Sequence, residues 1–233
     1  MTGGRNGFGA KLANIFSTEF IVETGDRAAD RHYRQVFKRN MSEKGEPVVG
    51  PNRSKQDFTR ITFVPDLAKF SMTHLEADTV ALMTKRVYDL AGVTDQRVKV
   101  LLNGKRLPIR DFGQYADCYL KGEEAKEQPR VAEAPSGRWE VICSLSEGAF
   151  TQVSFVNSIC TSKGGTHVEY IANQIISHVQ AVIQRKNKKL VVKPHQIRAH
   201  LWLFVNALIV NPAFDSQTKE TLNTKAAKFG STY

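Results

Sequence analysis

Cysteine is scarce in this chain of 233 residues, which has Cys118, Cys143 and Cys160 and no CxxC pair. This excludes a disulfide framework and a paired-cysteine zinc site, and it is typical of a protein in a reducing compartment. Long apolar runs are also lacking, since none approaches the roughly 18 residues that a membrane span requires. The N-terminus has no apolar signal-peptide core. We therefore expect a soluble intracellular protein with no membrane partner.

Acidic residues are absent from Tyr170 to Phe214, although signs of charge are normally mixed on a soluble surface. The whole chain has a net charge of +10 and a pI of about 9.6, which favours an anionic partner such as nucleic acid. We expect sequence-independent, salt-sensitive contacts with DNA phosphates, with an ordinary solvated surface as the alternative. The basic residues of this stretch are Arg185, Lys186, Lys188, Lys189, Lys193 and Arg198.

The first half of the chain alternates between strand-like and helix-like patterns. Apolar spacing predicts a short helix over residues 9–17 and a helix that ends at Gly92. The pair Asn103-Gly104 predicts a tight β-hairpin. Thr73 and Glu76 have the spacing of a capping box, in which each side chain satisfies a free amide at a helix start. Strands are expected at 19–23 and 58–65, and the polar stretch 25–56 is expected to form mobile surface hairpins or loops.

The second half predicts a linker, two strands and two helices. Residues 121–138 have almost no large apolar side chains and are expected to be a loop or linker. Strands are expected on either side of Glu147-Gly148. A second capping-box pattern, Thr166 to Glu169, predicts the start of a long helix, and a last helix is expected over residues 195–207. The whole pattern predicts two α/β or α+β units joined near residue 112.

Glycine is concentrated at the start of the chain, in the sequence MTGGRNGFGAK. Gly4 and Gly9 have the spacing of a P-loop, but Ala10 stands where the P-loop lysine is required. The dinucleotide-binding pattern does not fit either, because the glycine order is reversed and no strand precedes it. A glycine-rich loop that leads into a helix start is nevertheless suited to an anion. A phosphate site and a disordered leader both remain open from spacing alone.

Three segments together resemble the ATPase region of eukaryotic type II DNA topoisomerases, which belong to the GHKL ATPases with gyrase and MutL. They are GGRNGFGAKLANIFS, SFVNSICTSKGGTHVEY and FVNALIVNPAFDSQTKE. The third segment is similar to the end of a long helix and a following loop in that family. The resemblance covers essentially the whole chain. It implies an α+β fold, with residues 1–112 as the C-terminal part of a GHKL (Bergerat) ATP-binding domain. Residues 113–233 would then be a transducer domain with a ribosomal-protein-S5-domain-2-like fold.

The same resemblance implies roles for individual residues. The glycine-rich loop would be a lid that contacts the ATP phosphates through Gly4, Arg5, Asn6, Gly7, Phe8, Gly9, Ala10 and Lys11. Many relatives have tyrosine at the Phe8 position, so no hydroxyl role is assigned there. Gln217, Thr218 and Lys219 would contact ATP from the second domain, with Lys219 and Gln217 as catalytic residues and Lys219 at the γ-phosphate. Arg185, Lys186 and Lys188 would contact the DNA backbone.

Other parts of the family's machinery lie outside this sequence according to the resemblance. They are the glutamate general base, the asparagine that holds Mg²⁺, the aspartate that binds adenine, and the tyrosine that cleaves DNA. We therefore expect ATP and Mg²⁺ as cofactors of a larger nuclear homodimer acting on double-stranded DNA, with no metal ligands in this segment and no ATP hydrolysis by the 233 residues alone. The alternatives are a non-catalytic basic DNA-binding module and a MutL-like repair ATPase.

Overall fold

The structure is a computed structural model that describes residues 2–4, 6–121 and 128–233. The chain divides into two compact units, which are considered separately. The smaller unit contains Gly4–Val80, and the larger unit contains Ala81–Tyr233 together with Thr2 and Gly3. The predicted domain boundary at residues 112 and 113 differs from this division and stays a prediction.

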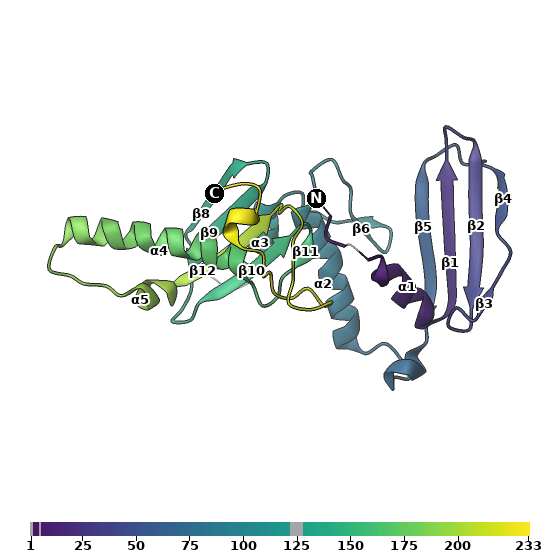
Figure 1. The fold of residues 1–233 in the computed structure, drawn as a ribbon, viewed down its shortest axis with the longest axis horizontal. Helices are drawn as coiled ribbons and strands as arrows, with labels where there is room; N and C mark the ends of the chain where they lie inside the picture. Colours follow the sequence, from purple (N-terminus) through teal and green to yellow (C-terminus); the bar gives the residue numbers. More distant parts are fainter. Residues whose placement is uncertain (1, 5, 122–127) are drawn as a thin grey trace. The chain divides into compact units, whose positions relative to one another are not determined.

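The smaller unit is an antiparallel sheet with one helix before it in sequence (Figure 1). Its strands have the order β3-β2-β1-β5, and β4 also pairs with β2. Strand β5 coincides with the predicted strand at 58–65. Helix α1 confirms the short helix expected over residues 9–17, and β1 confirms the strand expected at 19–23. The elements are α1 (Phe8–Ile15), β1 (Ser17–Asp26), β2 (Arg31–Lys38), β3 (Glu43–Lys44), β4 (Val48–Pro51), β5 (Phe58–Pro65) and the 3₁₀ turn η1 (Leu67–Phe70).

The hairpins expected over residues 25–56 are confirmed, whereas the expectation of loops is wrong for much of that stretch. Strand β2 pairs with β1 in continuous register from Glu19↔Lys38 to Asp26↔Arg31. Three of the eight residues of β2 are charged and none of its apolar residues is fully buried, and this composition hides the strand from a hydrophobicity argument. Backbone pairing, rather than burial of apolar side chains, orders this region.

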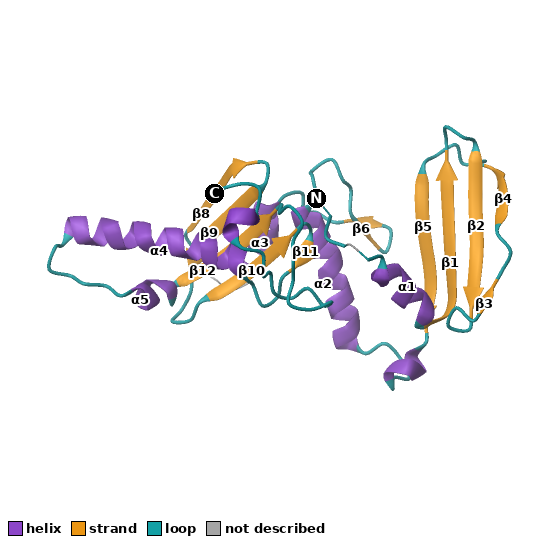
Figure 2. Ribbon diagram, viewed as in Figure 1, coloured by secondary structure: helices purple, strands orange, loops and turns teal. Residues whose placement is uncertain are grey.

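The larger unit is built on a five-stranded mixed sheet of order β11-β10-β12-β9-β8 (Figure 2). Strands β10 and β12 are parallel, whereas the other pairs are antiparallel. The two strands expected around Glu147-Gly148 are confirmed as β9 and β10, with β12 between them. The elements are α2 (Ala77–Val93, which begins in the smaller unit), β6 (Leu101–Leu102), β7 (Lys105–Arg106), α3 (Phe112–Leu120), β8 (Arg130–Ser136), β9 (Trp139–Leu145), β10 (Thr151–Val156), β11 (Ile159–Cys160), α4 (Thr166–Lys186), α5 (Pro194–Arg198), β12 (Leu201–Ala207) and the 3₁₀ turn η2 (Ala226–Lys228).

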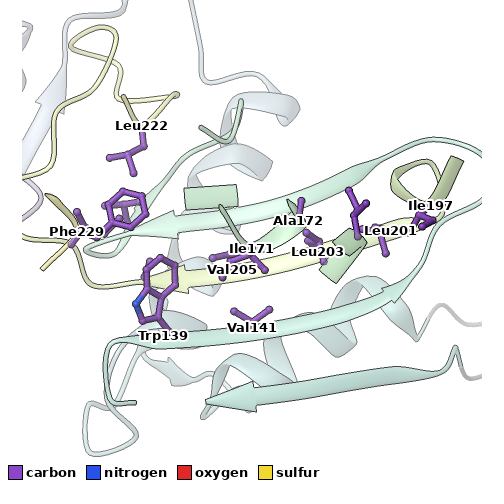
Figure 3. Packing of buried hydrophobic residues seen from close by; sticks show 14 residues of the cluster. Trp139, Val141, Ile171, Ala172, Ile197, Leu201, Leu203, Val205, Leu222 and Phe229 are labelled. Atoms are coloured by element: carbon purple, nitrogen blue, oxygen red, sulfur yellow. The ribbon is translucent and has the colours of Figure 1, made fainter. Parts of the chain in front are cut away.

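The sheet of the larger unit has a hydrophobic cluster on each face. On one face α4 contributes Ile171 and Ile176, which pack with Leu203 and Val205 of β12 and with Phe229 near the C-terminus. Figure 3 shows this cluster, with Trp139, Leu222 and Phe229 at one end of it and Ile197 and Leu201 at the other. On the opposite face Phe112 and Tyr115 of α3 pack with Phe155 of β10 and Phe204 of β12.

The helix predicted over residues 195–207 is wrong, because only Pro194–Arg198 is helical and Leu201–Ala207 is the central strand β12. The strand is buried on both faces, so its side chains are apolar without the alternation that marks a half-exposed strand. A short continuous apolar run does not distinguish a buried strand from a buried helix. The same finding corrects the expectation that residues 204–220 begin as the end of a long helix.

Two smaller expectations are also corrected. Part of the predicted linker, residues 130–136, is strand β8, an edge strand whose residues are all exposed; residues 122–127 of that linker lie outside the described residues. Neither capping box forms as expected. The Thr73 hydroxyl contacts His74 at 3.1 Å, and α2 begins only at Ala77. Gly165 is the N-cap of α4, and Glu169 is paired with Arg198 instead.

The Asn103-Gly104 hairpin is confirmed as the turn between β6 and β7, with both turn residues at positive φ. The long helix expected from Thr166 is confirmed as α4. Within the part of the chain that the structure describes, no helix combines the length and the apolarity needed to cross a bilayer.

Candidate functional site

The predicted phosphate lid is a turn followed by helix α1. Gly7 is the N-cap of α1 with φ 63°, a left-handed conformation that glycine adopts without the steric cost of a Cβ atom. The lid residues Gly4, Asn6, Gly7, Phe8, Gly9, Ala10 and Lys11 are all exposed. Arg5, the remaining predicted phosphate contact, lies outside the described residues.

The start of α1 has the physical properties of an anion site. The first amide groups of a helix have no partner within the helix, and the helix dipole adds positive potential at the same end. No side-chain cap from the described residues occupies the start of α1, and its first turn contains no acidic residue. Lys11 adds a positive charge one turn further along.

Lys219, the predicted switch lysine, contacts the beginning of the chain. Its Nζ donates a hydrogen bond to the Gly3 carbonyl at 3.0 Å across 216 residues of sequence. Both residues belong to the larger unit. The structure therefore brings the switch lysine to the residue that immediately precedes the lid in sequence.

The backbone of Lys219 has φ 60°, in the left-handed region that non-glycine residues seldom occupy. Conformations of this kind persist only where the surroundings enforce them, and they are concentrated at functional sites. Gln217 and Thr218 are exposed, and the Thr218 hydroxyl lies 2.7 Å from the Ser216 hydroxyl. The QTK triplet is thus a tight turn that presents polar groups to solvent and folds Lys219 back toward Gly3.

Asn157 is a site residue that the sequence argument missed. Its Nδ2 donates to the carbonyls of Thr2 at 3.2 Å and Ile209 at 2.9 Å, and its Oδ1 accepts from the Ile209 amide at 2.8 Å. It therefore joins the first residues of the chain to the segment that leads into the QTK turn. Asn157 and Ser158 both have positive φ, and an asparagine in the turn after a strand is the only sequence signal for this role.

The predicted DNA-contacting residues lie at the C-terminal end of α4 and just beyond it. Helix α4 extends past the sheet of the larger unit (Figure 1), and Arg185, Lys186 and Lys188 are all exposed. No ion pair among the described residues involves them. Arg198 from the same acid-free stretch differs, because it forms a two-point pair with Glu169 at 2.6 and 2.7 Å and lies over the Phe150 ring.

Titratable groups elsewhere have structural roles. Burial lowers the pKa of His167 to about 3, so this histidine is neutral in the folded protein. Its Nε2 lies 3.1 Å from the Thr161 hydroxyl, which fixes the start of α4. Burial raises the pKa of Cys143 and Cys160 above the usual value of a thiol. Among the described residues, no three His, Cys, Asp or Glu side chains are grouped closely enough to hold a metal ion.

Known proteins resemble this chain over almost its whole length. A family profile described as DNA gyrase B matches residues 111–232. DNA topoisomerase 2 of Arabidopsis thaliana is 56% identical over 234 residues, which cover 99% of this chain. The ATPase region of Saccharomyces cerevisiae topoisomerase II superposes with a TM-score of 0.89 at 44% identity. The ATPase and transducer domains of Balamuthia mandrillaris DNA topoisomerase II superpose with a TM-score of 0.90 at 44% identity.

Each solved structure is matched over 99% of this chain, and these matches confirm the predicted α+β fold and the resemblance to the ATPase region of type II topoisomerases. The chain spans only part of its relatives, namely 16% of the Arabidopsis protein and 58% of each of the two solved chains.

Proposed function

The chain belongs to the DNA gyrase B family, and from this premise we propose that it is the ATP-responsive segment of a type II DNA topoisomerase. The whole enzyme passes one DNA duplex through a transient double-strand break in another and so changes DNA topology. This segment supplies the lid and the switch lysine, which contact ATP, and a basic helix end that contacts DNA. The names of its relatives favour this function over a non-catalytic DNA-binding module or a MutL-like repair ATPase.

One observation carries the proposal, the 3.0 Å contact between Lys219 Nζ and the Gly3 carbonyl. A lysine at this position can exchange the neutral carbonyl for the γ-phosphate, because a concentrated negative charge is the stronger acceptor. The γ-phosphate is lost on hydrolysis, so the attraction exists only before the reaction. Differential binding of this kind couples nucleotide state to the position of the segment that carries Lys219.

The remaining lid residues hold the other phosphates in this proposal. The amides from Gly7 to Ala10 point their dipoles toward the anion, while Asn6, Gly4 and Lys11 add contacts, and Arg5 is included on the family resemblance. Gln217 assists Lys219, and Thr218 completes the turn. ATP supplies the free energy of hydrolysis, and Mg²⁺ is bound with it through the family's asparagine in a segment outside this sequence.

The basic helix end gives the segment its second partner, double-stranded DNA. Arg185, Lys186 and Lys188 neutralise backbone phosphates without reading the bases. We further propose that the whole enzyme is a nuclear homodimer, as the family resemblance implies.

The ATP contact is tested by placing this chain in the S. cerevisiae ATPase region in place of the 58% that it matches. Lys219→Ala should lower kcat for ATP hydrolysis by about 10²-fold, the usual effect of removing one group that stabilises developing charge. Lys189→Ala is the matched control, because it removes an exposed lysine of the helix end. Equal activities of the two variants would refute the role of Lys219. The 233 residues alone should not hydrolyse ATP.

The DNA contact is tested by the salt dependence of duplex binding to the chain. The double variant with Arg185→Ala and Lys186→Ala should reduce the slope of log K against log salt by about 1.8, from about 0.9 for each lost phosphate contact. The control pair, Lys105→Ala and Arg106→Ala, removes two adjacent exposed basic residues from the β6–β7 hairpin. An equal change of slope in both double variants would contradict a specific contact at the end of α4.

A further inference from the structure

The segment that carries Lys219 is a loop closed at its base; we name residues 213–224 the switch loop. The Asn223 amide donates to the Ala213 carbonyl at 2.8 Å, and the Asp215 amide donates to Thr221 at 3.2 Å. The Ala213 amide donates in turn to the Thr224 hydroxyl at 2.8 Å. At the tip, the Lys219 amide donates to the Ser216 carbonyl at 3.2 Å. These bonds fix the shape of the loop, but they do not fix its position on the larger unit.

A second segment fixes that position, the turn before α4 at residues 163–166, which we name the glycine turn. The Leu222 amide donates to the Gly164 carbonyl at 3.1 Å, and the Thr166 amide donates to the Leu222 carbonyl at 3.0 Å. The Lys163 amide bonds to the Glu220 carbonyl at 3.0 Å, next to Lys219 itself. The Lys163 and Glu220 side chains also pair at 2.8 Å, although this pair is exposed and contributes little by itself.

Gly165 lets the two backbones meet. Its φ is 131°, and a Cβ atom at this position would lie 2.4 Å from the Leu222 carbonyl oxygen and 2.5 Å from the Leu222 nitrogen. Both atoms belong to the backbone, so a side chain could be accommodated only by moving the switch loop. Leu222 cannot move freely either, because its side chain is fully buried in the cluster of Figure 3.

Thr166 adds a side-chain bond to the same contact. Its hydroxyl donates to the Thr224 carbonyl at 2.6 Å, while the Thr224 hydroxyl holds the other end of the switch loop through Ala213. Thr166 therefore connects the first turn of α4 to the base of the switch loop. The role explains why this threonine does not form the capping box that its spacing suggested.

We propose that the glycine turn is a clamp that positions Lys219, with Gly165 and Thr166 as positioning residues. The left-handed backbone of Lys219 is unfavourable and has to be held by its surroundings. Leu222, which the clamp grips, lies only three residues after Lys219. Loosening the grip lets the backbone relax and withdraws the amine from Gly3. The consequence for ATP rests on the proposed function, whereas the clamp itself can be tested in the chain alone.

The first test uses the 233-residue chain and three threonine variants. Thr166→Val removes the clamp hydroxyl and keeps the shape of the side chain, while Thr166→Ser retains the hydroxyl. Thr94→Val is the matched control, because the Thr94 hydroxyl also makes a 2.6 Å bond to a carbonyl, that of Leu90 in α2. The readouts are hydrogen exchange of the Leu222 amide and the acylation rate of Lys219, followed by mass spectrometry.

In Thr166→Val both rates should rise about three- to tenfold, which corresponds to the loss of one hydrogen bond. Thr166→Ser and Thr94→Val should leave them unchanged. Gly165→Ala should raise both rates further, because it displaces the loop backbone. An unchanged acylation rate of Lys219 in Thr166→Val would overturn the clamp. An equal increase in the acylation rate of Lys189 would also overturn it, because it would indicate that the whole chain has loosened.

The second test measures ATP hydrolysis in the chimera with the yeast ATPase region. Thr166→Val should lower kcat several-fold with little change in the KM for ATP, and Thr166→Ser should restore it. Loss of activity in Thr94→Val to the same extent would count against a positioning role. If Lys219→Ala leaves hydrolysis intact, the proposed function fails at that residue, while the exchange and acylation results still decide whether the clamp exists.

Discussion

The two units of the chain bury their apolar side chains to very different degrees. In the larger unit, two clusters enclose most of the large apolar residues of the sheet and its helices. Among the described residues of the smaller unit, Phe20 is the only large apolar side chain that is buried. Ile61, Phe63 and Val64 on β5 are about half exposed. The larger unit is thus stabilised by packing, whereas the smaller unit depends on strand pairing and on few apolar contacts.

The difference bears on the proposed function because the two segments that are proposed to contact phosphate lie in different units. The switch loop is part of the well-packed unit, where the clamp and Leu222 hold it. The lid begins at Gly4 and belongs to the smaller unit, which buries few apolar side chains. A lysine that is proposed to sense a phosphate requires a fixed position, to which the buried side chain of Leu222 contributes.

Truncating one phenylalanine in each unit tests the contrast, and the largest expected effect is that of Phe155→Ala in the larger unit. Phe155 is fully buried and packs edge-on against Phe112 and Tyr115, so Phe155→Ala should lower the unfolding free energy of the larger unit by about 3–5 kcal/mol. Fluorescence during denaturant unfolding reports this unit alone, because Trp139 and Trp202 both belong to it.

His167 provides an effect of intermediate size, through pH. Burial lowers its pKa from 6.5 to about 3, so below pH 6.5 the unfolded chain binds a proton that the folded chain does not. Stability should therefore fall by about 1.4 kcal/mol per pH unit below 6.5, or about 2 kcal/mol by pH 5, until the folded-state pKa is reached. His167→Gln should remove this part of the pH dependence. An identical pH profile in the variant would show that His167 does not titrate in this way.

The smallest expected effect is that of Phe63→Ala, the counterpart of Phe155→Ala in the smaller unit. Phe63 is 45% exposed and stacks on Phe20, so its removal should cost about 1 kcal/mol or less. Hydrogen exchange of the paired amides of β1 and β5 measures this cost. The contrast between the units would be broken if Phe63→Ala destabilised its unit as much as Phe155→Ala destabilises the other.

Sequence reasoning succeeded where local chemistry determines structure. The Asn103-Gly104 turn, strand β5 and the long helix α4 follow from turn chemistry and apolar spacing. It failed where strand pairing or burial determines the structure. Examples are β2, which has charged residues, and β12, which is buried on both faces of the sheet. For the candidate site, the family resemblance supplied the lid and Lys219, whose contacts with phosphate stay predictions. Contacts between distant segments, such as those of Asn157 and of Thr166 with Thr224, left little pattern in the sequence because their partners are backbone groups.

The central claim is that Lys219 senses the γ-phosphate, and lysine acylation in the chimera tests it most directly. The reactivities of Lys219 and Lys189 are compared with a non-hydrolysable ATP analogue bound and with ADP bound. Lys219 should be acylated several-fold more slowly with the analogue than with ADP, while Lys189 should react equally in both states. Equal reactivity of Lys219 with the analogue and with ADP would contradict the claim.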